Sequence, residues 1–220
     1  MVRSSIDELS GKYKPLGAEE RIAQLFRDFD KQRVFCTSSF GTTSLLLLHH
    51  LSRIAPHQII HFIDTGNHFT ETLEYKDGLA EILHLETRSL SASRDVHRYT
   101  RKNETWKTNM KYCCFLKKLS PLEKVIGDYD VWMSGLMKWQ IEDPTDLRIF
   151  EEQNGILRFF PFIDYSEEDF RHFLHSTDLP MHPLVERGYT SIGCVQCTRR
   201  GYDARGRKFG IRRSECGSLA

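Results

Sequence analysis

The 220-residue sequence lacks an apolar run long enough to cross a membrane. Its longest such run ends at Leu48 and is far shorter than the roughly 20 residues that a spanning helix needs. Residues 1–14 lack the apolar stretch of a secretory signal peptide. The net charge is only +1, so no overall field draws the chain to nucleic acid or to a membrane. We therefore expect a cytoplasmic globular protein without a membrane partner. The sequence leaves open whether the chain forms a homo-oligomer.

The sequence also lacks a Walker A motif and a GxGxxG pattern, but it has six cysteines. In a reducing compartment structural disulfides are rare, so clustered cysteines indicate metal or redox chemistry. The six are a lone Cys36 in an expected strand, the adjacent pair Cys113-Cys114, the pair Cys194 and Cys197, and Cys216 near the end. We expect Cys36 to belong to the core.

Short apolar strands alternate with helical stretches in the first half of the chain. The expected elements are helices over 17–30, 44–54 and 70–83 and strands over 33–37, 58–63 and 84–88. Farther along, the pattern predicts a helix over 113–126, a strand over 130–136, a hairpin around Asn154-Gly155 and a helix after the capping box 166–169. This order predicts an α/β fold, a doubly wound and mostly parallel sheet with flanking helices.

Two loops follow the first two strands and are expected to meet at one edge of the sheet, where open α/β sheets bind ligands. The candidate substrate-binding residues are Ser38, Ser39, Phe40 and Gly41 in the first loop and Asp64, Thr65 and Gly66 in the second. Backbone N–H groups at the start of the helix that follows the first loop can hold an anion. The alternative is an ordinary strand–helix turn capped by Ser and Thr.

The paired cysteines Cys113, Cys114, Cys194 and Cys197 could bind zinc or an iron–sulfur cluster. Adjacent helical side chains diverge by about 100°, which suits a cluster of several irons better than one small ion. A third alternative is a set of buried thiols that pack as small hydrophobic groups.

Residues 199–213 hold seven Arg or Lys against one acid, and Cys216 follows them. A free thiol is about 3% thiolate at pH 7, and nearby arginines enrich that nucleophile. We expect residues 201–220 to form a mobile catalytic tail beside a single domain of residues 1–200. The alternatives are an incidental terminal thiol and a basic tail that contacts RNA; with only Tyr202 and Phe209 interleaved, the RNA alternative is disfavoured.

Several short motifs share one order along the chain. They are Ser38-Ser39-Phe40-Gly41, Ile63-Asp64-Thr65-Gly66-Asn67-His68-Phe69, Cys113-Cys114 with Lys117-Lys118, His182-Pro183-Leu184, Gly193-Cys194 through Cys197-Thr198-Arg199, and Glu215-Cys216-Gly217. On these motifs the sequence resembles the adenylyl-sulfate and phosphoadenylyl-sulfate (APS/PAPS) reductase family, in its iron–sulfur-containing assimilatory type, from about residue 33 to the end.

The resemblance implies an adenine nucleotide alpha hydrolase-like fold and a 4Fe-4S cluster on the four paired cysteines. It implies that Cys216 attacks the sulfate sulfur of adenylyl sulfate, and that thioredoxin or glutaredoxin then releases sulfite. Lys118 is the implied catalytic lysine near the cluster and the substrate. Arg199, Arg205 and Arg207 are the further implied substrate-binding residues.

The sequence departs from the family pattern at two places. Met137-Lys138-Trp139-Gln140-Ile141 stands where Arg-Arg-x-Gln-Ser is usual, and Ser218-Leu219 replaces a terminal Leu-His. The first change removes a bidentate guanidinium, so it bears on substrate affinity more than on chemistry. Three alternatives stay open: the same reaction on 3'-phosphoadenylyl sulfate, a sulfur-transfer or adenylating enzyme, and a zinc-stabilised binding module.

Overall fold

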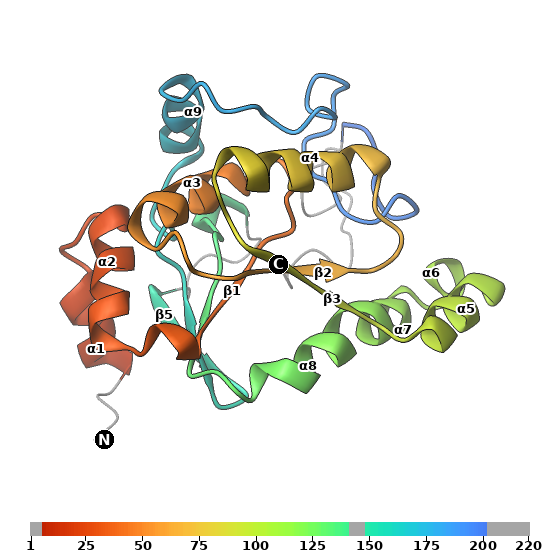
Figure 1. Cartoon of the computed structure of the whole chain (residues 1–220), viewed down its shortest axis with the longest axis horizontal. Helices are drawn as coiled ribbons and strands as arrows, with labels where there is room; N and C mark the ends of the chain where they lie inside the picture. Colours follow the sequence, from red (N-terminus) through yellow and green to blue (C-terminus); the bar gives the residue numbers. More distant parts are fainter. Residues whose placement is uncertain (1–5, 141–147, 202–220) are drawn as a thin grey trace.

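Residues 6–140 and 148–201 are described by the structure, a computed structural model. They form a six-stranded sheet with helices on both faces (Figure 1). The strands are β1 (Val34–Thr37), β2 (Ile60–Asp64), β3 (Thr87–Ser91), β4 (Val131–Met133), β5 (Phe150–Gln153) and β6 (Ile156–Phe159). Their order is β3-β2-β1-β4-β6-β5, and every neighbouring pair is parallel except β5 and β6. The predicted fold class is confirmed.

The helices lie in layers on this sheet. Above it in Figure 1 lie α3 (Leu45–Ile54) and α4 (Thr70–Ile82), and below it lies α8 (Ser120–Ile126). The others are α1 (Ile6–Tyr13), α2 (Ala18–Asp28), α5 (Arg94–Lys102), α6 (Thr105–Thr108), α7 (Met110–Cys114) and α9 (Glu167–His175). Within the described ranges, no helix has the length and apolar character to cross a membrane.

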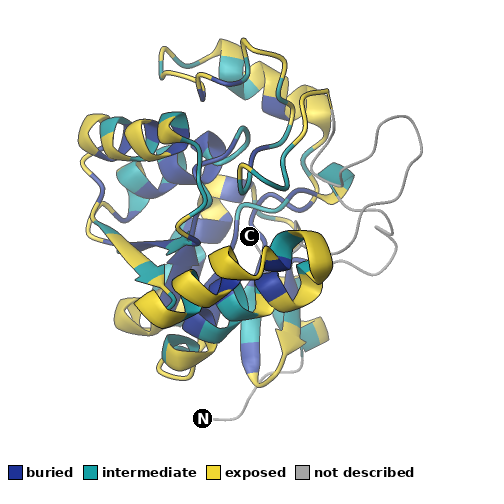
Figure 2. Cartoon of the chain, turned by 90° about the vertical axis from the view of Figure 1, so that its right-hand side faces the viewer, coloured by how far each residue is buried: buried dark blue, intermediate teal, exposed yellow. Residues whose placement is uncertain are grey.

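Side chains alternate between the two faces of each strand, and this alternation builds two cores. Val34 and Cys36 of β1 join the large cluster under α3 and α4, whereas Phe35 packs with Leu122 of α8 and Trp132 of β4. Figure 2 shows the buried residues gathered in the centre of the molecule. Cys36 is fully buried as predicted, and burial raises the pKa of its thiol.

Three details differ from the sequence prediction or sharpen it. The third strand begins at Thr87 rather than at residue 84, because His84 adopts a left-handed conformation (φ 53°) just after α4. The helix expected over 113–126 is interrupted by a π-helical turn, η2 (Phe115–Leu119), between α7 and α8. The hairpin prediction is confirmed, since Asn154 and Gly155 both have positive φ (53° and 82°), as a type I′ turn requires.

Candidate active site

The two predicted loops leave the sheet at the same edge. β1 and β2 are adjacent and parallel, with Cys36 opposite Ile60. The N–H of Ser38 donates to the carbonyl of His61 at 3.1 Å, so the pairing continues one step past β1. The carboxyl ends of these strands therefore bring both loops to one crevice, which is the usual ligand site of an open α/β sheet.

The first loop is a tight turn that uses its own hydroxyl groups. Phe40 has a left-handed conformation (φ 49°), and its N–H donates to Ser38 Oγ at 3.1 Å. The N–H of Gly41 donates to Ser44 Oγ at 3.0 Å. A Cβ on Gly41 would lie 3.4 Å from the carbonyl oxygen of Ile192, so glycine allows a distant segment to approach. An anion that binds to these two N–H groups must displace the serine hydroxyls.

The second loop turns sharply after β2. The N–H of Gly66 donates to Asp64 Oδ1 at 2.8 Å, and Gly66 itself has φ +64°. A Cβ on Gly66 would lie 2.9 Å from the ring of His97, so this position needs glycine for both reasons. Thr65 is buried, and its Oγ1 lies 3.2 Å from the sulfur of Cys194. This loop therefore reaches the second cysteine pair.

The segment 182–201 has no long helix or strand, and hydrogen bonds hold it on α4 and on both loops. His182 is 1% exposed. Its Nε2 lies 3.0 Å from Thr72 Oγ1, and its Nδ1 accepts a hydrogen bond from the N–H of Leu184. Burial lowers the pKa of His182 to about 4. Near the cysteines, the N–H of Val195 donates to the carbonyl of Asn67 at 2.8 Å.

One cavity collects the four paired cysteines. It is lined by Thr65 and Asn67 from the second loop, Trp106 and Met110, Cys113 and Cys114, Lys117 and Lys118, and Cys194, Gln196 and Cys197. Cys113, Cys194 and Cys197 are free thiols, whereas Cys114 is disulfide-bonded in this structure. The structure thus brings together cysteine pairs that are 80 residues apart in sequence.

Lys117 is the buried cation of this cavity. Only 3% of the residue is exposed. Burial lowers the pKa of Lys117, and the negative charges of Cys113 and Cys194 act in the opposite direction. When the Asn67 amide is oriented to satisfy its hydrogen bonds, Asn67 accepts from Lys117 Nζ at 2.9 Å and donates to the carbonyl of Gly66. The predicted catalytic residue, Lys118, lines the same cavity but is more exposed.

The cavity can be tested against the two metal groups that the sequence left open. In residues 6–140 and 148–201, no three His, Cys, Asp or Glu side chains form a group that could hold a single metal ion. A cluster of several irons is larger than one ion, so its four thiolate ligands lie farther apart. The donor set is all sulfur, which suits iron–sulfur chemistry, and Trp106 and Met110 add apolar walls. The sulfur donors therefore match the chemistry of an iron–sulfur cluster, but in this structure Cys114 is disulfide-bonded and only the other three are free thiols.

Of the remaining predicted site residues, Arg199 lies in the described part of the chain and three others do not. Arg199 is exposed, and its Nη1 donates to the carbonyls of Gln196 and Thr198, so it braces the cysteine turn and does not line the cavity. Arg205, Arg207 and Cys216 lie outside the described residues.

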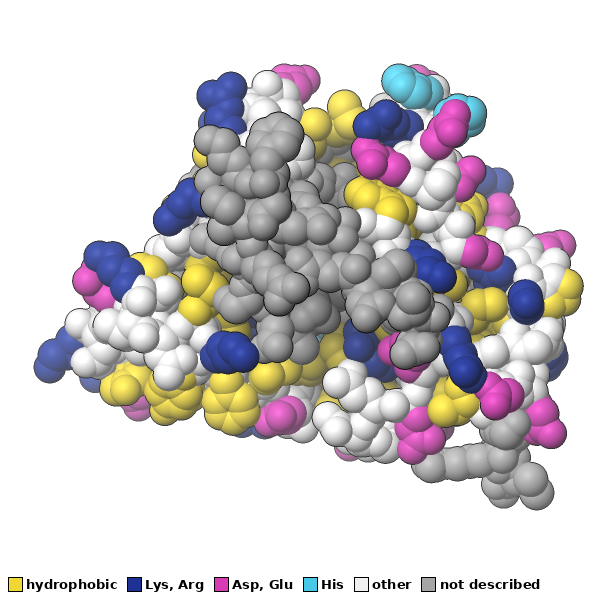
Figure 3. Space-filling model, turned by 180° about the vertical axis from the view of Figure 1, so that it is seen from behind, with side chains coloured by type: hydrophobic (Ala, Val, Ile, Leu, Met, Phe, Trp, Pro, Cys, Tyr) yellow, Lys and Arg dark blue, Asp and Glu magenta, His cyan; other side chains and the backbone are white. Residues whose placement is uncertain are grey.

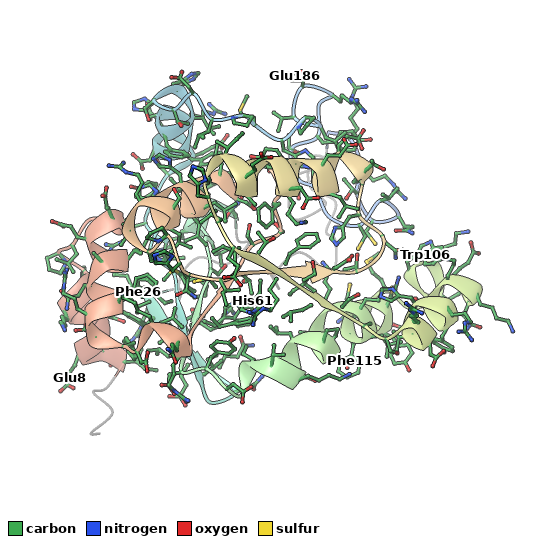
Figure 4. The ribbon with its side chains drawn as sticks, viewed as in Figure 1. Glu8, Phe26, His61, Trp106, Phe115 and Glu186 are labelled. Carbon is green, nitrogen blue, oxygen red and sulfur yellow. The ribbon has the colours of Figure 1, made fainter. Side chains whose placement is uncertain are left out.

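Sequence reasoning missed several residues of the site. Trp106 comes from the short helix α6 (Figure 4), in a stretch without a clear pattern. The sequence spacing could have indicated Lys117, because it follows Cys113 by four residues and residues at this spacing share a helix face. Gln140 follows β4 and matches the Gln of the Arg-Arg-x-Gln-Ser pattern, and its Nε2 donates to Thr43 Oγ1 at 3.0 Å at the end of the first loop.

Comparisons with known proteins find related sequences and a related fold. The sequence model of the family described as phosphoadenosine phosphosulfate reductase domain matches residues 33–200. An adenosine 5'-phosphosulfate reductase of a Chelativorans species is 33% identical, over 96% of this chain and 89% of that protein. A phosphoadenosine 5'-phosphosulfate reductase of Vibrio cholerae is 29% identical, over 96% and 87%. The crystal structure of a phosphoadenylyl-sulfate reductase from Candida auris has a TM-score of 0.76 at 21% identity and covers 90% of this chain and 98% of that one.

Proposed function

The chain belongs to the phosphoadenosine phosphosulfate reductase family, and on this premise we propose that it reduces adenylyl sulfate to sulfite and AMP in sulfate assimilation. The relatives are reductases of a sulfated adenine nucleotide, which supports an oxidoreductase of this class. The observation that carries the proposal is the single cavity in which two cysteine pairs and two lysines meet beside Thr65 of the second loop.

The proposed cofactor is a 4Fe-4S cluster held by Cys113, Cys114, Cys194 and Cys197. All four line one cavity, and three of them are free thiols. When bound, the cluster supplies an electrostatic field around the sulfate group, as the family resemblance implies. Thr65 fixes the position of the Cys194 sulfur, and Lys117 places a buried positive charge near Cys113 and Cys194.

The proposed reaction consists of two displacements at sulfur. The Cys216 thiolate attacks the sulfate sulfur, the bond from that sulfur to the phosphate oxygen breaks, and AMP leaves with the bonding electrons. The enzyme then carries an S-sulfocysteine. A thiolate of thioredoxin or glutaredoxin attacks the Cys216 sulfur, sulfite leaves with the electron pair of the S–S bond, and a mixed disulfide forms. The second thiol of the partner resolves this disulfide, so the partner dithiol supplies both electrons.

The described residues account for binding and for charge. The two loops at the carboxyl ends of β1 and β2 form the crevice for the nucleotide. Lys118, which lines the same cavity from a half-buried position, is proposed to face the negative charge that develops on the sulfonyl and phosphate oxygens, and a fixed cation there lowers the barrier. The tail residues Arg205 and Arg207 are proposed to contact the phosphosulfate.

The alternative substrate is 3'-phosphoadenylyl sulfate. The names of the Vibrio and Candida relatives favour it, whereas the Chelativorans relative favours adenylyl sulfate. The cysteine pairs support adenylyl sulfate, because the family members with a cluster mostly take that nucleotide.

The experiment is a comparison of both nucleotides with anaerobically purified protein. Sulfite release is measured with reduced thioredoxin, and again with dithiothreitol as a small-molecule reductant. We expect a brown protein with four irons per chain and a higher kcat/KM for adenylyl sulfate. A colourless, iron-free protein that prefers the 3'-phosphorylated nucleotide would overturn both the cofactor and the substrate. No sulfite from either nucleotide would overturn the function.

A further inference from the structure

Helix α5 concentrates positive charge on one face. Arg94, His97, Arg98, Arg101 and Lys102 follow one another at intervals of three, one, three and one residues, which places them along one helical stripe. The five line an open hollow of about 470 Å³ on the surface. In Figure 3, which views the molecule from behind, Lys and Arg side chains lie along the left-hand edge, on the side that carries α5.

The fold does not require this arrangement. Like charges four residues apart on a helix repel, at a cost of about 0.2–0.5 kcal/mol per pair. Arg98 is 3.2 Å from Asp95, but within the described part of the chain Arg94, Arg101 and Lys102 have no ion pair. On α9, by contrast, the positive charge of Arg171 is compensated, because Glu167 one turn earlier forms an ion pair with it. The stripe of α5, in which Arg94, Arg101 and Lys102 lack such a pair among the described residues, indicates an anionic partner.

The stripe lies next to the candidate active site. The His97 ring packs on the Gly66 turn of the second loop, and its Nε2 is 3.0 Å from Ser91 Oγ at the end of β3. The turn η2, which carries the cavity residues Lys117 and Lys118, contacts α5. A partner bound on α5 would therefore sit beside the cavity in which the proposed chemistry occurs.

The character of the surface favours a protein over a small anion. Arg94, Arg98 and Lys102 are exposed, and the stripe is about 12 Å long at 1.5 Å per residue, much longer than one phosphate. Tyr99 is exposed on the same helix (48%), and the turn η2, which contacts α5, carries the exposed Phe115 (42%). Aromatic side chains together with arginine are typical of protein interfaces, whereas small ligands need a concave, enclosed site.

We propose that the basic face of α5, with Tyr99 and Phe115 beside it, docks an acidic surface of the dithiol protein that reduces the enzyme adduct. The inference rests on the proposed function, since that function requires a protein dithiol. Charge of this kind acts mainly on the association rate and is screened by salt.

The test is direct binding of thioredoxin to the full chain, measured by calorimetry at low and at high ionic strength. In the double variant Arg94→Glu with Arg98→Glu, we expect affinity to fall about tenfold at low salt and the difference to shrink at high salt. The matched control is Arg27→Glu with Lys31→Glu, at the end of α2 and the turn before β1, and should bind like wild type. Arg94→Gln with Arg98→Gln is the milder pair, with a smaller loss expected, and serves if the glutamate pair fails to fold.

Equal binding by wild type and the α5 variants, or no binding by wild type, overturns the docking inference. Sulfite release driven by dithiothreitol, and the KM for nucleotide, should not change in the α5 variants. A raised nucleotide KM with unchanged thioredoxin binding would assign the stripe to the substrate and refute the inference. If a single-stranded RNA probe binds the α5 face and does not compete with thioredoxin, the inference is refuted as well. Failure of the proposed function is separate, because it appears as absence of sulfite in the wild type with dithiothreitol.

Discussion

Lys117 and Lys118 are neighbours in sequence but differ in their surroundings. Lys117 is buried, its ammonium group bonds to the Asn67 amide oxygen, and it faces two of the four cysteines. Lys118 lines the same cavity from a more exposed position. Because the π-helical turn η2 begins directly after Cys114, both side chains reach the cavity. On this geometry we propose that Lys117 compensates the thiolate charge and that Lys118 acts on the substrate.

Replacement of Lys117 should weaken binding of the proposed cluster. Lys117→Met keeps the length of the side chain but leaves the thiolate charge without its buried counterpart. We expect iron to be lost about tenfold faster on exposure to air, corresponding to about 1.4 kcal/mol of lost compensation. The measurement is the decay of the visible absorption together with iron content. Lys117→Arg restores the charge and should retain most of the iron; identical decay in wild type and Lys117→Met would refute this role.

Replacement of Lys118 should affect chemistry and spare the cluster. Lys118→Ala removes a cation from the developing charge, so the rate of enzyme sulfonation should fall by about 10²-fold. Single-turnover kinetics with labelled nucleotide measure this step, and the visible spectrum reports the cluster in the same sample. A variant that sulfonates as fast as wild type would contradict the assignment.

At the scale of elements, two buried polar side chains, Arg21 and His182, hold segments that are not part of the sheet. Arg21 of α2 is 2% exposed and forms a bidentate ion pair with Asp164 at 2.7 Å. It also donates to the carbonyls of Tyr13, Lys14 and Pro161. Burial acts to raise the pKa of Asp164, but the hydrogen bonds and charge of Arg21 outweigh it and hold that pKa below its usual range. One guanidinium thus joins the N-terminal helices to the turn after β6.

Loss of this guanidinium should destabilise the fold. Arg21→Met leaves three carbonyls without their donor, and we expect the free energy of unfolding to fall by about 3 kcal/mol. Urea unfolding followed by circular dichroism measures it. Arg33→Met is the control, because the Arg33–Asp130 ion pair is solvent-exposed and its removal should change stability little. Equal losses in the two variants would contradict the account.

His182 makes the docking of segment 182–201 sensitive to pH. Its pKa is about 4 in the folded chain, below the ordinary 6.5, so the unfolded chain binds the proton more tightly. The neutral ring's contribution is fully present above about pH 6.5 and is lost as pH falls toward 4, by up to about 3 kcal/mol. Unfolding measured between pH 7 and 4 should show a steeper loss in wild type than in His182→Gln. Parallel curves would show that His182 does not carry the effect.

At the scale of the whole molecule, the sequence predicted what local patterns determine. Apolar strands, helical spacing and the Asn154-Gly155 turn predicted the α/β fold, and both loops lie at the predicted edge of the sheet. The four-cysteine site was expected from family motifs, and the structure places both cysteine pairs in the lining of one cavity. The π-helical turn and the contribution of Trp106 were not predictable, because they depend on how α5, α6 and α7 pack beyond β3.

Contacts between distant segments also escaped prediction. The Asn67 bridge to Lys117 and the Thr65 contact to Cys194 join the second loop to residues 50 and 129 positions later. No local period encodes such pairs, since the first requires η2 to pack against the second loop and the second requires segment 182–201 to fold back onto that loop. The basic stripe of α5 was present in the sequence, but its position beside the cavity required the fold.

The most direct test of the account is mass spectrometry of the intact protein after one turnover without reductant. Wild type incubated with adenylyl sulfate should gain the mass of one SO₃ group, located on Cys216 by peptide mapping, with one equivalent of AMP released. Addition of reduced thioredoxin should remove that mass and release sulfite. Cys216→Ser should keep the cluster spectrum and gain no mass. AMP release without a covalent adduct, or an adduct that persists in Cys216→Ser, would contradict the central claim.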